Sequence, residues 1–183
     1  MANPSVDVPG TLGFCTVRAH AEHGYFGGYL ILNTHARPLE FHCTLPVKPS
    51  RAQEILYGRT LCDFVCGEQI AKALTSKAKL TPHVVLTDCS AVLALSRVSD
   101  LLVACLVDPS GNASVSSVPS TDPERMRKIK FGNHAAMILR DDMHSEERLR
   151  ELWQTLDLTM DLCEPFQRIE EALTEAHPIM KAA

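Results

Sequence analysis

The apolar and polar positions between residues 28 and 58 define two strands, a turn and a short helix. Residues 29–32 are continuously apolar, which is typical of a central strand covered on both faces. Residues 39–45 alternate between apolar and polar side chains, which predicts a strand with one face on a core. The segment between them, residues 33–38, begins with Asn and ends with Pro and predicts a hairpin turn.

A proline-bounded elbow follows the second of these strands. Pro46 and Pro49 end the strand, because proline cannot donate a hydrogen bond to a neighbouring strand. Ser50 and Gln53 have the spacing of a capping box, in which each side chain accepts a hydrogen bond from the other residue's backbone N–H. We therefore expect a helix over residues 51–57, which the following glycine ends.

The same patterns predict the rest of an α/β domain. The further elements are a strand over residues 12–20, a helix over 60–77, a strand over 84–88, a helix over 90–98 and a strand over 101–107. Strands that alternate with helices pair in parallel through right-handed crossovers. The chain thus predicts a mixed sheet, in which a three-stranded antiparallel meander precedes an α-β-α-β unit. Ribonuclease-H-like sheets share this order with other mixed sheets, and the order alone implies no function.

The length of 183 residues favours one domain with a full core. Residues 1–10 contain two prolines and predict a flexible tail, and residues 11–183 form the single domain. Within it, residues 111–122 are polar and predict a loop. Residues 145–177 predict a C-terminal segment of two amphipathic helices.

Net charge and targeting signals narrow the classes of partner. The net charge of −4 argues against nucleic acid and anionic membranes as partners. The first ten residues lack the basic start and apolar run of a secretory signal. No apolar run approaches the ~20 residues that cross a bilayer. We therefore expect a cytoplasmic protein without membrane contact.

Two segments resemble a conserved bacterial family that carries no assigned activity. The first is P-V-K-P-S-R-A-Q-E-I-L-Y-G over residues 46–58, followed by the pair Gly67-Glu68. The second is L-C-E-P-F-Q-R-I over residues 162–169, which is similar to the start of that family's C-terminal helix. The resemblance spans most of the chain and implies no reaction, cofactor or site residue.

Two acids lie in unusual places for surface side chains. Glu68 falls on the apolar stripe of the helix over residues 60–77, and Asp88 ends a buried strand. Ligands of open α/β sheets bind beyond the carboxyl ends of the strands, where two or three acids can hold Mg²⁺ for phosphodiester cleavage. Asp141 and Asp142 are the candidates for a third acid.

The first predicted strand argues against such a metal site. Residues 12–20 contain no Asp or Glu, whereas ribonuclease-H-like nucleases resemble one another in placing an aspartate there. Structural roles are the simpler alternative. Glu68 would accept hydrogen bonds from loop amides or pair with an arginine, and Asp88 would cap the helix that follows it.

The seven cysteines form no complete metal or redox motif. They are Cys15, Cys43, Cys62, Cys66, Cys89, Cys105 and Cys163. Cys62 and Cys66 share a helix face and could bind a metal or form a redox pair, but no second pair completes a zinc site. Cys89 follows a strand end, where the adjacent aspartate would raise the pKa of a nucleophilic thiol. We expect reduced thiols that pack as small hydrophobes.

A basic segment over residues 125–130 follows the pair Asp122-Pro123, which has the form of a helix N-cap and first residue. We therefore expect a short basic helix, and then a strand over residues 134–139. A solvated helix face is the simplest role for this segment, because no aromatic residues interleave with the basic ones to stack on bases.

Taken together, these patterns predict a non-catalytic protein that binds no cofactor and acts through a protein partner or through further copies of itself. The alternative is a divalent-metal-dependent nuclease or phosphodiesterase of ribonuclease-H-like fold. It would use Mg²⁺ held by Glu68, Asp88 and either Asp141 or Asp142. Ligands of one Mg²⁺ lie ~2.1 Å from the ion, so the alternative requires these acids to converge.

Overall fold

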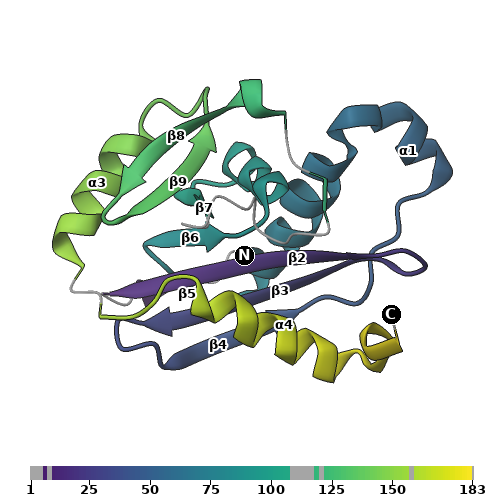
Figure 1. Ribbon diagram of the computed structural model, residues 1–183, viewed down its shortest axis with the longest axis horizontal. Coiled ribbons are helices and arrows are strands. Elements are labelled where there is room, and N and C mark those ends of the chain that lie inside the picture. Colours follow the sequence, from purple (N-terminus) through teal and green to yellow (C-terminus); the bar gives the residue numbers. More distant parts are fainter. Residues whose placement is uncertain (1–5, 8–9, 108–117, 120–121, 157–158, 183) are drawn as a thin grey trace.

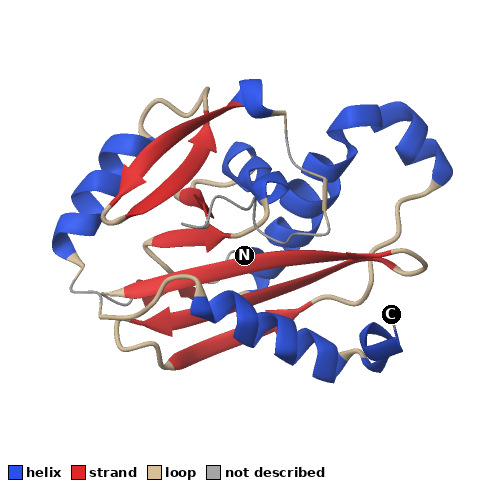
Figure 2. Cartoon of the chain, viewed as in Figure 1, coloured by secondary structure: helices blue, strands red, loops and turns tan. Residues whose placement is uncertain are grey.

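Seven strands form one mixed sheet in the computed structural model, and helices cover both of its faces (Figure 1, Figure 2). The structure describes residues 6–7, 10–107, 118–119, 122–156 and 159–182. Most of the predicted polar loop over residues 111–122 lies outside these ranges. Two described residues of the predicted tail, Val6 and Asp7, form β1 (Val6–Asp7), which pairs with β5 (Leu80–Thr81).

The strand order of the sheet is β4-β3-β2-β6-β7-β9-β8. The strands are β2 (Thr11–His20), β3 (Gly24–Asn33), β4 (Pro38–Cys43), β6 (Val84–Thr87), β7 (Val103–Val107), β8 (Met126–Phe131) and β9 (His134–Leu139). β2, β3 and β4 form the antiparallel meander, and β6 and β7 continue the sheet in parallel with β2. This arrangement confirms the predicted fold class, with the ribonuclease-H-like order in its first five strands.

The helices follow the predicted order, with two departures in type. They are α1 (Arg51–Tyr57), η1 (Gly58–Thr60), η2 (Asp63–Ala71), α2 (Lys72–Lys77), η3 (Ser90–Arg97), η4 (Pro123–Arg125), α3 (Ser145–Thr155), α4 (Glu164–Ala176) and η5 (Pro178–Ala182). η2 is a π-helix, and η3 is a 3-10 helix. In the described part of the chain, none of these helices has the length and apolarity that a bilayer crossing needs.

Two adjacent glycines in β3 allow a helix to approach each face of the sheet. A Cβ atom on Gly27 would lie 2.2 Å from Ile70 Cγ2 of η2. A Cβ atom on Gly28 would lie 2.3 Å from Ile169 Cγ2 of α4. Because successive strand residues point to opposite faces, η2 and α4 cover opposite sides of the sheet. The glycine pair thus lets one helix approach the strand closely from each side.

Each face of the sheet has its own apolar core. The core on the η2 face includes the buried side chains of Tyr29 and Leu93. The core on the α4 face includes Phe14 and Phe166, whose rings meet edge to face with centroids 5.6 Å apart. Burial of apolar surface on both faces is the main stabilising contribution of this architecture.

Residues 126–131 form strand β8, so the predicted basic helix is wrong. Asp122 does cap a turn by accepting a hydrogen bond from Glu124 N, but that turn, η4, has only three residues. The next six residues pair with β9. This pairing buries Ile129 and Phe131, an apolar gain that a solvated basic helix would lack.

Candidate functional site

The candidate site lies at the carboxyl end of β6, which stops beside Cys15 in the middle of β2. The chain continues from β2 to β3 on one side and from β6 toward β7 on the other. Ligands of open α/β sheets bind at such a point of divergence. Asp88 follows β6 directly, and Arg18 lies near the end of β2, so both belong to this position.

Arg18 fills the candidate site with each of its side-chain nitrogen atoms hydrogen-bonded. Its Nη2 lies 2.7 Å from Oδ2 of Asp88, and its Nη1 donates to the Thr16 hydroxyl. Its Nε donates to Oε2 of Glu170 on α4 at 3.1 Å. The Thr16 hydroxyl donates in turn to Oδ1 of Asp88 at 2.5 Å. We call these four residues the Arg18 cluster.

The Arg18 cluster is shielded from water at its centre. The side chains of Arg18 and Asp88 are 12% and 13% exposed, whereas Glu170 is 54% exposed. Burial disfavours the charged guanidinium, but the hydrogen bonds and charges of Asp88 and Glu170 outweigh this effect and raise the pKa of Arg18 above its ordinary value. Arg18 is therefore positively charged at neutral pH.

A permanent charge at this point opposes a bound metal ion. Two unit charges 4 Å apart repel by about 4 kcal/mol at an effective dielectric constant of about 20, and a divalent ion doubles this energy. The oxygen atoms of Asp88 and Thr16 are already engaged with the guanidinium or with each other. Mg²⁺ prefers near-octahedral oxygen coordination, so the residues present at this position do not fit it.

Glu68 lies apart from the Arg18 cluster. It belongs to η2, whereas Glu170 of the cluster belongs to α4 on the opposite face of the sheet. Glu68 is half-buried. Within the described residues it makes no hydrogen bond or ion pair, so the structural acceptor role expected for it is not seen.

Asp141 and Asp142 lie near the start of β7, away from the carboxyl end of β6. β9 runs antiparallel to β7, so the end of β9 that leads into these two acids lies beside the start of β7. Asp141 Oδ2 is 3.5 Å from Arg97 Nη2, and Asp142 accepts a hydrogen bond from Ser145 N at 3.2 Å. Asp142 thus binds Ser145, the first residue of α3, and no hydrogen bond or ion pair joins either acid to Asp88 among the described residues.

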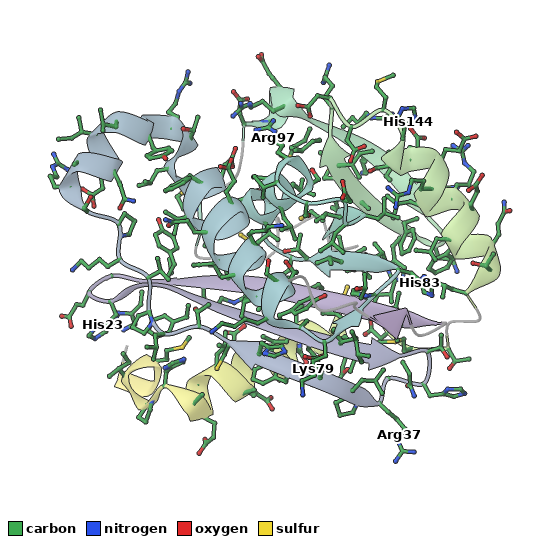
Figure 3. The ribbon with its side chains drawn as sticks, turned by 180° about the vertical axis from the view of Figure 1, so that it is seen from behind. His23, Arg37, Lys79, His83, Arg97 and His144 are labelled. Atoms are coloured by element: carbon green, nitrogen blue, oxygen red, sulfur yellow. The ribbon has the colours of Figure 1, made fainter. Side chains whose placement is uncertain are left out.

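Figure 3, the view from behind, labels residues that flank these elements. In Figure 3, His144, two residues after Asp142, lies on the same side of the molecule as His83 at the start of β6. His23, in the turn after β2, lies on the opposite side. Among all described residues there is no group of three or more His, Cys, Asp or Glu side chains that could hold a metal ion. The proposed Mg²⁺ ligands therefore do not converge.

The cysteines near the candidate site are unsuited to nucleophilic chemistry. A hydrogen bond with Cys89, together with burial, raises the pKa of the Cys66 thiol. Burial also raises the thiol pKa of Cys15 and Cys105. The thiolate is the form that attacks and that binds metals. Cys62, the expected partner of Cys66, contacts a tyrosine hydroxyl at 3.8 Å.

The sequence analysis missed Arg18 and Thr16. The two residues lie two positions apart in β2, so their side chains point to the same face of the sheet. The earlier residues on that face, Leu12 and Phe14, are apolar and buried. A charged residue that continues an apolar face requires a buried partner, and this rule could have linked Arg18 to Asp88.

Comparisons with known proteins find similar solved structures but no matching family. Neither protein-family models nor curated protein sequences match it. Two solved structures of endonuclease V from Ciona intestinalis are similar to it. One is bound to a 23mer DNA with an inosine followed by a ribo-adenosine. It is 9% identical, with an alignment that covers 92% of this chain and 87% of the endonuclease chain, and it has a TM-score of 0.45. The other, bound to a corresponding 24mer, is 11% identical, covers 93% and 86%, and has a TM-score of 0.46.

These two structures correct one expectation. Both contain DNA, which contradicts the sequence-based argument against nucleic acid as a partner. That argument used the net charge of −4, an average over the whole surface that does not describe any local patch. The identities are too low to transfer residue roles, so the properties of the candidate site rest on the geometry of this chain.

Proposed function

We propose that this chain is a ribonuclease-H-like binding domain, which acts through contacts with other proteins and not through metal-dependent phosphodiester cleavage. The Arg18–Asp88 ion pair carries the proposal. It places a guanidinium where cleavage by this fold would need a cation and free carboxylates. The acids that would have to assist Asp88 lie elsewhere, with Glu68 on η2 and Asp142 beside the start of α3.

Metal binding tests this proposal directly. Isothermal titration of the full chain with Mg²⁺ and with Mn²⁺ should give no saturable heat up to millimolar concentrations, because Asp88 is engaged by Arg18. The matched control is Asp88→Asn, which should give the same flat titration. Saturable Mn²⁺ binding by the wild type that Asp88→Asn removes would contradict the proposal.

A metal-dependent nuclease is the second candidate function. One observation favours it, namely that Asp88 follows β6 at the carboxyl edge of a ribonuclease-H-like sheet. The probe is a DNA oligonucleotide with an inosine followed by a ribo-adenosine, the nucleic acid bound by the two endonuclease V structures. We expect no cleavage with Mg²⁺ or Mn²⁺ above the buffer background. Cleavage that Asp88→Asn abolishes would replace our proposal with this one.

A further inference from the structure

The α1 arm, which we define as residues 46–60, is fixed to the body of the protein at both ends. At its base, Val47 and Tyr25 exchange two backbone hydrogen bonds of 2.8 Å each. At its far end, the ring of Tyr57 stacks on Phe64, with centroids 4.0 Å apart and planes 15° apart. These two anchors hold the arm in one orientation relative to the sheet.

Helix α1 contacts its own domain through the ring of Tyr57, its last residue. None of its seven residues is buried, and it stands away from the sheet (Figure 1). The reciprocal capping box of Ser50 and Gln53 forms its first turn. An isolated helix of this length is unstable in water. The capping box and the two anchors therefore stabilise α1.

Two aliphatic side chains of α1 are largely exposed. Ile55 is 65% exposed and Leu56 is 82% exposed. Successive helical residues are about 100° apart, so Ile55 points about 160° away from Tyr57. Because Tyr57 stacks toward η2, Ile55 faces outward, and Leu56 points about 100° away from each of them. The arm therefore presents an apolar helix face to its surroundings.

Basic side chains surround this apolar face. Arg51 lies four residues before Ile55, on the same row of the helix surface. Arg59 follows the end of the helix, in η1, and Lys48 precedes the helix at the base of the arm. The one acid of the helix, Glu54, is paired with Arg51 at 2.9 Å. The rim of the apolar face thus carries a net positive charge on a protein whose overall charge is −4.

We propose that the α1 arm docks into an apolar groove with an acidic rim on another protein. Insertion of a short amphipathic helix into such a groove is a common recognition mode, and the basic rim selects for acidic neighbours. The inference rests on the proposed binding function and names its partner class.

The arrangement of charges disfavours other occupants of this face. Two copies that paired through this arm would bring together two segments of net positive charge, and like charges repel. Two aliphatic side chains also offer less apolar area than one myristoyl chain, which alone gives only marginal membrane binding of about 10⁴ M⁻¹.

Photo-crosslinking in the organism that encodes the chain begins the test. The full chain carries p-benzoylphenylalanine at Leu56, or at the exposed Glu151 of α3 as a control position. We expect an adduct with one other protein at Leu56 only, and its loss when Arg51→Glu and Arg59→Glu are added. The absence of an adduct specific to Leu56, or an adduct of twice the chain mass, would overturn the proposal.

Binding with purified components completes the test. The crosslinked protein should bind the wild-type chain with an affinity that falls with salt. Ile55→Glu should weaken binding at least tenfold, and Arg150→Glu on α3 should leave it within twofold. Equal binding by all three chains would overturn the proposal. Sedimentation of the wild type with vesicles of phosphatidylcholine and phosphatidylglycerol would also overturn it, if Ile55→Glu did not sediment with them. Neither variant touches the Arg18 cluster, so these results test the docking proposal alone, whereas metal binding or DNA cleavage by the wild type would contradict the proposed function.

Discussion

The Arg18 cluster and the α1 arm invert the usual distribution of polar and apolar side chains. The cluster places two oppositely charged side chains at 12% and 13% exposure, whereas the arm leaves Leu56 at 82% exposure. In the cluster each charge has a partner within the same chain. In the arm, Ile55 and Leu56 are left largely exposed. The comparison separates a region whose groups are paired within the chain from one that, in our proposal, is covered by a second protein.

The two regions also differ in how they respond to substitution. Removing one member of a buried ion pair leaves an uncompensated charge, which is among the costliest changes a protein core undergoes. Changing an exposed side chain that contacts nothing alters folding very little. The predictions below use this difference, from the largest expected effect to the smallest.

Arg18→Met should be the most destabilising of these changes, because it leaves the Asp88 carboxylate buried without its guanidinium. We expect a loss of about 3 kcal/mol in the free energy of unfolding, measured by urea denaturation at pH 7. The control is Arg150→Met, which removes an exposed pair with Glu146 and should cost no more than about 0.5 kcal/mol. Equal losses in both variants would show that the Arg18 cluster is not buried in solution.

Gly28→Val tests the contact that holds α4, and with it Glu170, over the Arg18 cluster. A Cβ atom at this position would lie 2.3 Å from Ile169 Cγ2, so α4 must shift. Overpacking of this kind costs about 1–3 kcal/mol, which thermal unfolding would detect. Adding Ile169→Ala should recover part of the loss, and no recovery would mean that α4 does not pack on this strand.

Glu40 provides an intermediate case, since its carboxylate is held at the edge of the sheet. Burial opposes its ionisation, but hydrogen bonds from His42 and from the backbone N–H groups of Lys79 and Leu80 outweigh burial and lower the pKa of Glu40. A lowered pKa in the folded state stabilises the protein above the unfolded value of about 4.3, and this contribution is lost as the pH falls through the folded pKa.

Glu40→Gln should therefore cost about 1 kcal/mol at pH 7, with the difference from wild type shrinking as the pH falls from about 5 to 3. Urea denaturation at a series of pH values measures this difference. A constant difference across that range would indicate that the hydrogen bonds, and not the charge of Glu40, account for the effect.

Ile55→Glu with Leu56→Glu should have the smallest effect on folding. Neither side chain is buried, so the free energy of unfolding should stay within about 0.5 kcal/mol of wild type. Calorimetric melting of both proteins measures this difference. A loss comparable to that of Arg18→Met would show that the α1 arm packs against its own domain and is not available to a partner.

The parts of the fold that the sequence predicted are those whose signals are local. The capping box of α1 needs only Ser50 and Gln53, three residues apart, and it forms as expected. The apolar run in β3 likewise depends on neighbouring residues. The alternation over residues 39–45 located β4, but the predicted core face was wrong, because Leu39 and Phe41 are 43% and 38% exposed and Glu40 and His42 are the less exposed residues. β8 was missed because the local signal, the Asp122 cap, is real but covers three residues, whereas pairing with β9 decides the conformation that follows.

The candidate site was only partly predictable, because its contacts connect distant positions. Asp88 was correctly placed at a strand end, but its partner Arg18 lies 70 residues earlier, and Glu170 lies 152 residues after Arg18. The helix η2 is likewise constrained by a contact between distant positions. At Gly67 a Cβ atom would lie 2.7 Å from that of Ala94, so contact with η3 constrains this helix. No spacing along the chain encodes such contacts.

The glycine pair of β3 has a mechanical consequence. At Gly27 and Gly28, Ile70 of one helix and Ile169 of the other press against consecutive residues of the same strand, so a single thickness of backbone separates the two helical layers. Closely packed interiors have low compressibility and transmit strain. A displacement of η2 at this point would therefore be passed to α4 and, through Glu170, to the guanidinium at the end of β2. The strand β3 would thus couple the two helical layers mechanically across the sheet.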